Sequence, residues 1–91
     1  MTRLEAMRNA VNAYEPHPAD CRKSFYGKAL IVEYANGDEA LVSYDTVVML
    51  RKANGEYINT WGGWSATTGR HIAAFSGLNK AAYDKLPYVE L

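Results

Sequence analysis

The chain is poor in cysteine, proline and histidine, with one, three and two of them in 91 residues. A single cysteine, Cys21, excludes an intramolecular disulfide and favours a reducing compartment. Ten basic residues balance ten acidic ones, so the formal net charge is zero and favours neither nucleic acid nor an anionic membrane. No apolar run is long enough to cross a bilayer, and no charged-then-apolar leader follows Met1. We therefore expect a soluble, cytoplasmic protein with no membrane partner.

Sequence patterns that mark a cofactor or metal site are also missing. Gly62-Gly63 lacks the lysine and the spacing of a phosphate-binding P-loop. His17, Asp20 and Cys21 are too few for a metal site and do not have the spacing of metal ligands. We predict that the protein needs no cofactor and no metal.

The N-terminal segment has the pattern of an amphipathic helix, from about Arg3 to Tyr14. Thr2 and Glu5 have the spacing of a capping box. Apolar residues at three- and four-residue steps form one face that should pack on a sheet: Leu4, Met7, Val11 and Tyr14. Pro16 and Pro18 then favour an extended linker over residues 15–27.

Residues 28–61 should form a four-stranded antiparallel meander, because Asn36-Gly37 and Asn54-Gly55 separate β-branched and aromatic runs. The expected strands are 29–34, 39–44, 47–52 and 57–61. A two-residue loop at Asn36-Gly37 would place Tyr34 opposite Glu39 and Val32 opposite Leu41. Both faces of this hairpin are substantially apolar, so the second face should be covered by C-terminal helices or by a partner, which includes a second copy.

A helix should begin at Ser65 or Thr67, run to about Ser76 and end at Gly77. Asn79 should cap a short last helix, Lys80 to Leu86, before Pro87. We therefore predict one α+β domain over residues 1–91, with an N-terminal helix, the meander, and two short helices within 65–86.

The run from Trp61 to His71 holds both tryptophans and three hydroxyl side chains. Ser65, Thr67 and Thr68 near His71 meet the minimum for nucleophilic catalysis, but no nucleophile-elbow motif is present and such hydroxyls usually cap helices. An anion at the helix start would compensate Arg70 and a protonated His71. We expect Trp61 to be buried and Trp64 to be partly exposed.

Two motifs resemble a small domain family of unknown function that is encoded mainly by phages and other mobile elements. One is the Ser-Tyr-X-Thr motif Ser43-Tyr44-Asp45-Thr46. The other is Trp61 with Ser65-Ala66-Thr67-Thr68-Gly69-Arg70-His71 and then Phe75, in which Gly69 is unusual for a helix. The resemblance covers about residues 39–75 and implies that the following side chains lie close together: Ser43, Tyr44, Thr46, Ser65, Thr67, Thr68 and His71.

The preferred hypothesis is a non-catalytic phage-type protein that binds a host protein, and one form of it is an inhibitor of host defence of the anti-CRISPR kind. The candidate contact residues are Tyr44, Trp64, Ser65, Thr67, Thr68, Arg70 and His71. One alternative is a binder of small anions or nucleotide phosphates at Ser65–His71. A weaker alternative is a nucleic-acid binder that uses Arg3, Arg8, Arg22, Lys23 and Lys28.

Overall fold

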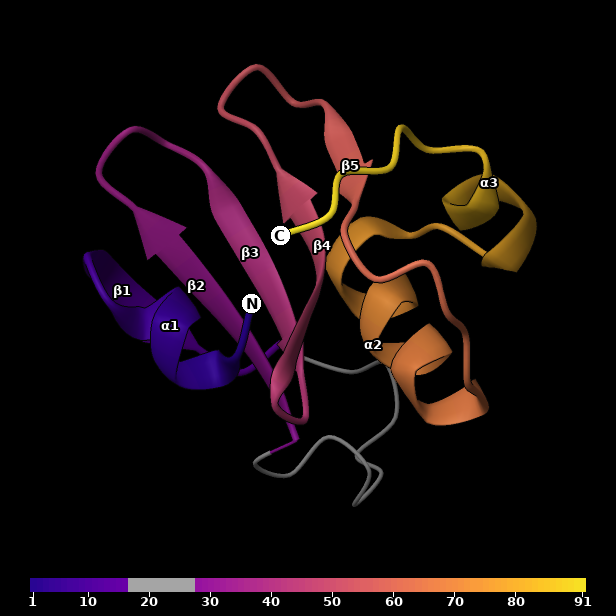
Figure 1. The fold of residues 1–91 in the computed structure, drawn as a ribbon, viewed down its shortest axis with the longest axis horizontal. Coiled ribbons are helices and arrows are strands. Elements are labelled where there is room, and N and C mark those ends of the chain that lie inside the picture. The colour runs from indigo at the N-terminus through magenta and orange to yellow at the C-terminus, as the bar shows by residue number, and fades with distance from the viewer. Residues whose placement is uncertain (17–27) are drawn as a thin grey trace.

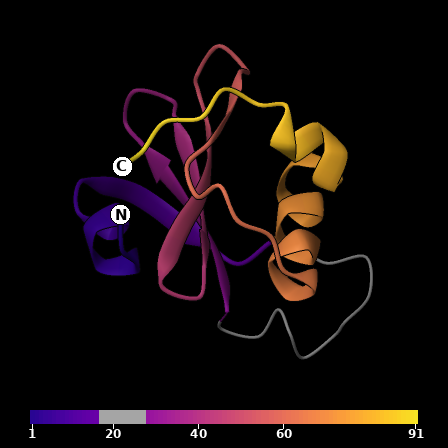
Figure 2. The same ribbon diagram turned by 45° about the vertical axis from the view of Figure 1, so that its right-hand side comes forward.

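A computed structural model describes residues 1–16 and 28–91. These residues form three helices, α1 (Arg3–Met7), α2 (Ala66–Ser76) and α3 (Lys80–Asp84), and five strands, β1 (Ala10–Tyr14), β2 (Ala29–Tyr34), β3 (Glu39–Ser43), β4 (Thr46–Arg51) and β5 (Tyr57–Asn59). The strands form one antiparallel sheet in the order of the chain. Helix α1 lies on one face of the sheet, and α2 and α3 lie on the other (Figures 1 and 2). The predicted α+β class is confirmed.

Most of the predicted linker, including His17, Asp20, Cys21, Arg22 and Lys23, lies outside the described residues. None of the helices in the described part of the chain is long and apolar enough to cross a membrane.

The N-terminal helix is much shorter than the sequence predicted. The capping box of Thr2 and Glu5 forms, but the helix ends at Met7 because Arg8 is extended and Asn9 has a φ of 65°. The chain then reverses into β1, which pairs with β2 and makes the sheet five-stranded instead of four-stranded. Pairing with a neighbouring strand thus overrides a local helical pattern.

The prediction of which side chains of this segment pack on the sheet is also wrong. Its four apolar residues, Leu4, Met7, Val11 and Tyr14, are exposed. The small residue Ala6 is buried against the sheet instead, and Ala10 and Ala13 pack beside it.

The predicted first hairpin is present, but its register differs by one residue. Val32 lies opposite Ala40, where Leu41 was expected. The reason is a three-residue loop: Tyr34 N–H donates to the Asp38 carbonyl, and Gly37 has a φ of 93°. A one-residue shift changes which β3 side chains share a face with β2.

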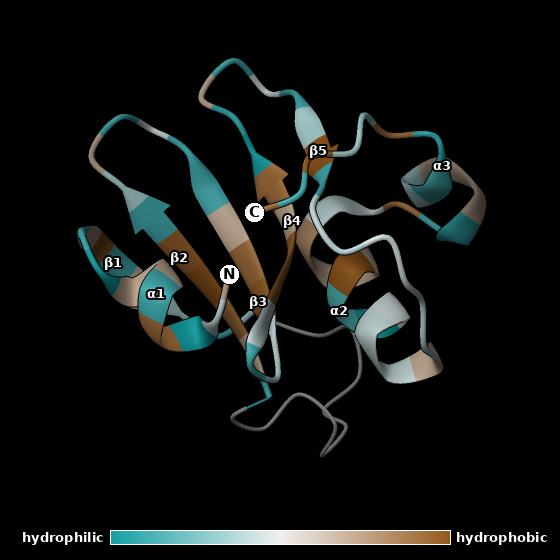
Figure 3. Ribbon diagram, viewed as in Figure 1, coloured by the Kyte–Doolittle hydropathy of each residue, from teal (hydrophilic) through white to brown (hydrophobic). Residues whose placement is uncertain are grey.

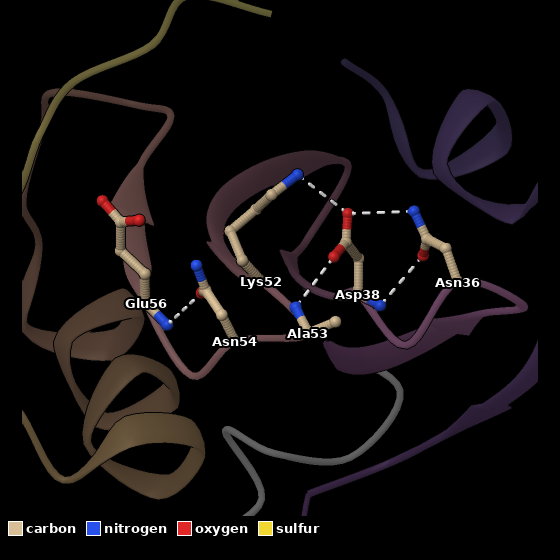
Figure 4. Close-up of polar contacts among 6 residues, drawn as sticks. All are labelled: Asn36, Asp38, Lys52, Ala53, Asn54 and Glu56. Carbon is tan, nitrogen blue, oxygen red and sulfur yellow. Dashed lines mark hydrogen bonds and ion pairs between the residues drawn. The ribbon is translucent and has the colours of Figure 1, made fainter.

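The second hairpin repeats this turn at Ala53-Asn54-Gly55, with Gly55 at a φ of 91°. In both turns the asparagine Oδ1 accepts a hydrogen bond from the backbone N–H two residues on. The two hairpin tips are also joined, since the Asp38 carboxylate accepts from Lys52 Nζ and Ala53 N–H, each at 2.9 Å (Figure 4). The Lys52 hydrogen bond is the main cause that lowers the pKa of Asp38.

Two hydrophobic cores lie on opposite faces of the sheet, and Figure 3 shows the apolar middle strands between them. The core under α1 consists of Ala6, Leu30, Val32, Ala40, Val42 and Val47. The core under α2 and α3 consists of Ile31, Leu41, Val48, Met49, Ile72 and Tyr83. A bulge at Val48 lets two consecutive residues of β4, Val48 and Met49, face the second core.

The predicted helix caps are confirmed, with Ser65 as the N-cap of α2, Gly77 as its C-cap at a φ of 78°, and Asn79 as the N-cap of α3. Strand β5 ends at Asn59, two residues earlier than predicted. The chain after α3 packs along β5, because Asn59 exchanges backbone hydrogen bonds with Pro87 and Val89.

Candidate functional site

The corner between β5 and α2 is built by Asn59, which sequence reasoning did not single out. Its Oδ1 accepts hydrogen bonds from Trp61 N–H at 3.0 Å and Gly62 N–H at 2.8 Å. Gly62 has a φ of 78°, which favours glycine. An asparagine that ends a strand just before a glycine pair is the sequence feature that marks such a corner.

Both tryptophans at this corner pack on the second core. Trp61 is half-buried, so the prediction that it is buried is wrong, whereas the partial exposure of Trp64 is confirmed. The Trp64 ring covers Gly69, where an added Cβ would lie 2.5 Å from a ring carbon, and its centroid is 5.6 Å from that of Tyr83. This contact explains the glycine within α2. Trp64 is therefore a packing residue of the corner.

A buried hydroxyl–imidazole cluster, made of Ser43, Thr68 and His71, joins β3 to α2. The Ser43 Oγ lies 2.9 Å from Thr68 Oγ1 and 2.8 Å from His71 Nδ1. The exposed fractions are 3% for Ser43, 4% for Thr68 and 0% for His71. The proximity of these residues, which the family resemblance implied, is confirmed.

A serine hydroxyl within hydrogen-bond reach of an imidazole is the geometry of an activated nucleophile. In this cluster the pair is closed off from solvent, so a substrate cannot approach Ser43 Oγ in this conformation. Buried hydrogen-bonded groups of this kind hold two elements in one relative position. We interpret the cluster as a lock between β3 and α2.

Several groups that would bind an anion at this helix start are already engaged in contacts within the protein. The Ser65 Oγ already accepts the Thr68 N–H at 3.1 Å, and the His71 imidazole is buried against Ser43. Thr67 is half-buried, and Arg70 is exposed and forms no ion pair within the described ranges. Arg70 is thus the one charged group of this helix start that faces solvent.

Tyr44 stands directly beside the buried cluster, in the two-residue turn that joins β3 to β4. It has a φ of 57°, and 48% of its surface is exposed. Its N–H donates to the Lys28 carbonyl at 2.7 Å, and its ring centroid is 5.9 Å from that of His71. Glycine usually occupies such a turn position, and a bulky residue there carries a conformational cost of roughly 1–3 kcal/mol.

These features define a small α+β protein in which helix α2 is held against an antiparallel sheet by a buried polar cluster. The chain belongs to DUF8033, a family of unknown function, whose model matches residues 13–89. No curated protein and no solved structure matches it significantly. The matched range includes Tyr44, the buried cluster and the corner at Asn59.

Proposed function

We propose that this protein is a non-catalytic binding protein and that its contact surface is centred on Tyr44. The observation that carries the proposal is a half-exposed aromatic side chain held at positive φ. Backbone strain of this kind persists where surrounding structure enforces it, and it concentrates at ligand-contacting sites. Glycine would relieve the strain at this turn, so the ring itself is the reason to keep tyrosine there.

The buried cluster gives this surface a fixed shape. Ser43, the residue before Tyr44, is hydrogen-bonded to both Thr68 and His71. Arg70, the neighbour of His71 in α2, is exposed. Tyrosine and arginine dominate the binding energy of many protein interfaces, and a surface that is already ordered loses little entropy on binding.

The proposed partner is a host protein, because the strand and helix motifs resemble a phage and mobile-element family. Inhibition of a host defence complex is the specific form that we propose, since inhibition by binding requires a shaped surface and no reaction. This part of the proposal comes from the resemblance and from the size of the chain.

The test is capture of a partner from a host lysate, followed by mass spectrometry, with Tyr44→Asn as the critical variant. Asparagine tolerates positive φ, so this change removes the ring without adding backbone strain. Tyr88→Asn is the matched control because Tyr88 is similarly exposed, at 55%, but follows α3. We expect the wild type and Tyr88→Asn to capture one dominant protein and Tyr44→Asn to lose it, with a melting temperature no lower than that of the wild type.

Equal capture by the wild type and Tyr44→Asn would show that the surface lies elsewhere. Absence of any specific partner in repeated captures would argue against a binding function. Growth of a defence-competent host challenged with phage, with and without expression of the chain, tests the inhibitor form separately.

A further inference from the structure

The two edges of the sheet differ in how they are covered (Figure 1). The β5 edge is paired with the C-terminal segment through Asn59, Pro87 and Val89. Strand β1 pairs with β2 on one side, and nothing in the described structure pairs with its outer side. The ladder to β2 shifts between Ala10 and Asn12, so the regular edge runs from Asn12 to Tyr14.

The β1 edge lacks the usual chemical protection against strand pairing. Residues 10–14 include no charged residue and no proline, which are the residues that most often protect exposed edges. Exposed apolar side chains accompany it within the strand itself: Val11 is 66% exposed and Tyr14 is 39% exposed. Together they offer backbone hydrogen-bonding groups and apolar area at one edge.

We propose that a second copy of this chain pairs with the β1 edge, strand β1 against strand β1, in antiparallel orientation. Such an interface is self-complementary, because each copy contributes the same edge about a twofold axis. It would continue the five-stranded sheet from one copy into the other. This inference does not depend on the proposed function at Tyr44.

Charge permits pairing with a second copy and favours the antiparallel direction. The chain has no formal net charge, so two copies do not repel each other over distance. Arg8 precedes β1 and Glu15 follows it. Antiparallel pairing brings the Arg8 end of one copy to the Glu15 end of the other, whereas parallel pairing would bring like charges together.

The experiment is sedimentation equilibrium of the full chain over a range of concentrations. We expect the mass to rise with concentration from 10.1 kDa towards twice that value. Val11→Lys should weaken association by roughly tenfold or more, because it places two lysines at the shared edge. Val89→Lys is the matched control, since Val89 is also an exposed valine but lies beside β5.

Hydrogen exchange of the unaltered protein provides a second measurement that needs no variant. The amides of residues 10–14 that point away from β2 should become more protected as the concentration rises, while those of β5 should not change. A mass of one copy at every concentration, or an equal loss of association in both lysine variants, would overturn the proposal. Concentration-independent exchange of β1 would overturn it too.

Discussion

The face of the sheet under α1 is lined mainly by aliphatic side chains, with Tyr34 packed against them, whereas the face under α2 and α3 holds several aromatic rings and the buried polar cluster. A helix of five residues with one buried side chain, Ala6, covers the first face. The second face is covered by α2, α3 and both tryptophans. The first face is therefore covered by a short helix whose backbone lies close to the sheet. The second face is covered by large side chains with specific partners.

This difference assigns different roles to the two faces. Small side chains allow α1 to approach closely, but they bury little apolar area and specify few unique contacts. Rings and hydrogen-bonded groups on the second face fix the orientation of α2 relative to β3. We expect stability and the shape of the Tyr44 surface to depend mainly on the second face.

The largest effect should come from Tyr83, which is fully buried on the second face and donates a hydrogen bond from its hydroxyl to the Val48 carbonyl at 2.7 Å. Tyr83→Ala should lower the free energy of unfolding by about 3–5 kcal/mol, measured by urea denaturation, because it leaves a large cavity. Tyr88→Ala, at an exposed ring, is the control. A loss below about 1 kcal/mol for Tyr83→Ala would contradict the importance of this face.

The next largest effect is a loss of stability at alkaline pH, which should arise mainly from the face under α2 and α3. Burial raises the pKa of Tyr83 to about 12, from its usual value of 10.0. The unfolded chain therefore loses this proton first, so the stabilisation is complete below pH 10 and is lost as the pH rises towards 12. This difference between the folded and unfolded pKa of Tyr83 corresponds to at most about 3 kcal/mol in the free energy of unfolding.

The comparison residue for this pH effect is Tyr34, which donates its hydroxyl to the Ala6 carbonyl on the α1 face and whose pKa burial also raises. We expect Tyr83→Phe to remove more of the alkaline loss of stability than Tyr34→Phe, as followed by denaturation at several pH values. An equal effect of the two variants would remove this distinction between the faces.

Removal of the central hydroxyl should have a smaller effect. Ser43→Ala leaves Thr68 and His71 buried without their shared partner, which should cost about 2 kcal/mol. It should also weaken partner capture through Tyr44, because the turn is then no longer held to α2 by the hydrogen bonds of Ser43. Thr67→Ala is the control, since Thr67 lies in α2 beside Thr68 but is not part of the cluster. Unchanged stability in Ser43→Ala would show that the cluster does not lock the two elements.

Local sequence chemistry predicted one part of the molecule well. The caps at Ser65, Gly77 and Asn79 are where the sequence placed them, because each depends on a side chain or a φ value within one turn of the chain. The positions of β2 and β3 were also predicted, since β-branched runs and Asn-Gly turns are local features. The closeness of Ser43 and His71 came from the family resemblance.

The features that were mispredicted depend on contacts between distant residues. The segment 10–14 fits a helical pattern, but β2 supplies it with backbone partners 17 to 24 residues further along the chain. The register at Val32 depends on whether the loop has two or three residues, and Asn-Gly occurs in both kinds. The strain at Tyr44 follows from the turn that the paired strands impose.

The smallest effect is expected on the α1 face, at Leu4. The helical pattern predicted that Leu4 packs inward, in which case Leu4→Ala would cost about 2–5 kcal/mol. The structure exposes 68% of its surface, so the change should alter the free energy of unfolding by less than about 0.5 kcal/mol. Ile72→Ala, at a fully buried residue of α2, should show the full cost of a lost core side chain. Urea denaturation at low protein concentration separates these values clearly, and a cost above about 2 kcal/mol at Leu4 would mean that α1 covers its face with large side chains after all.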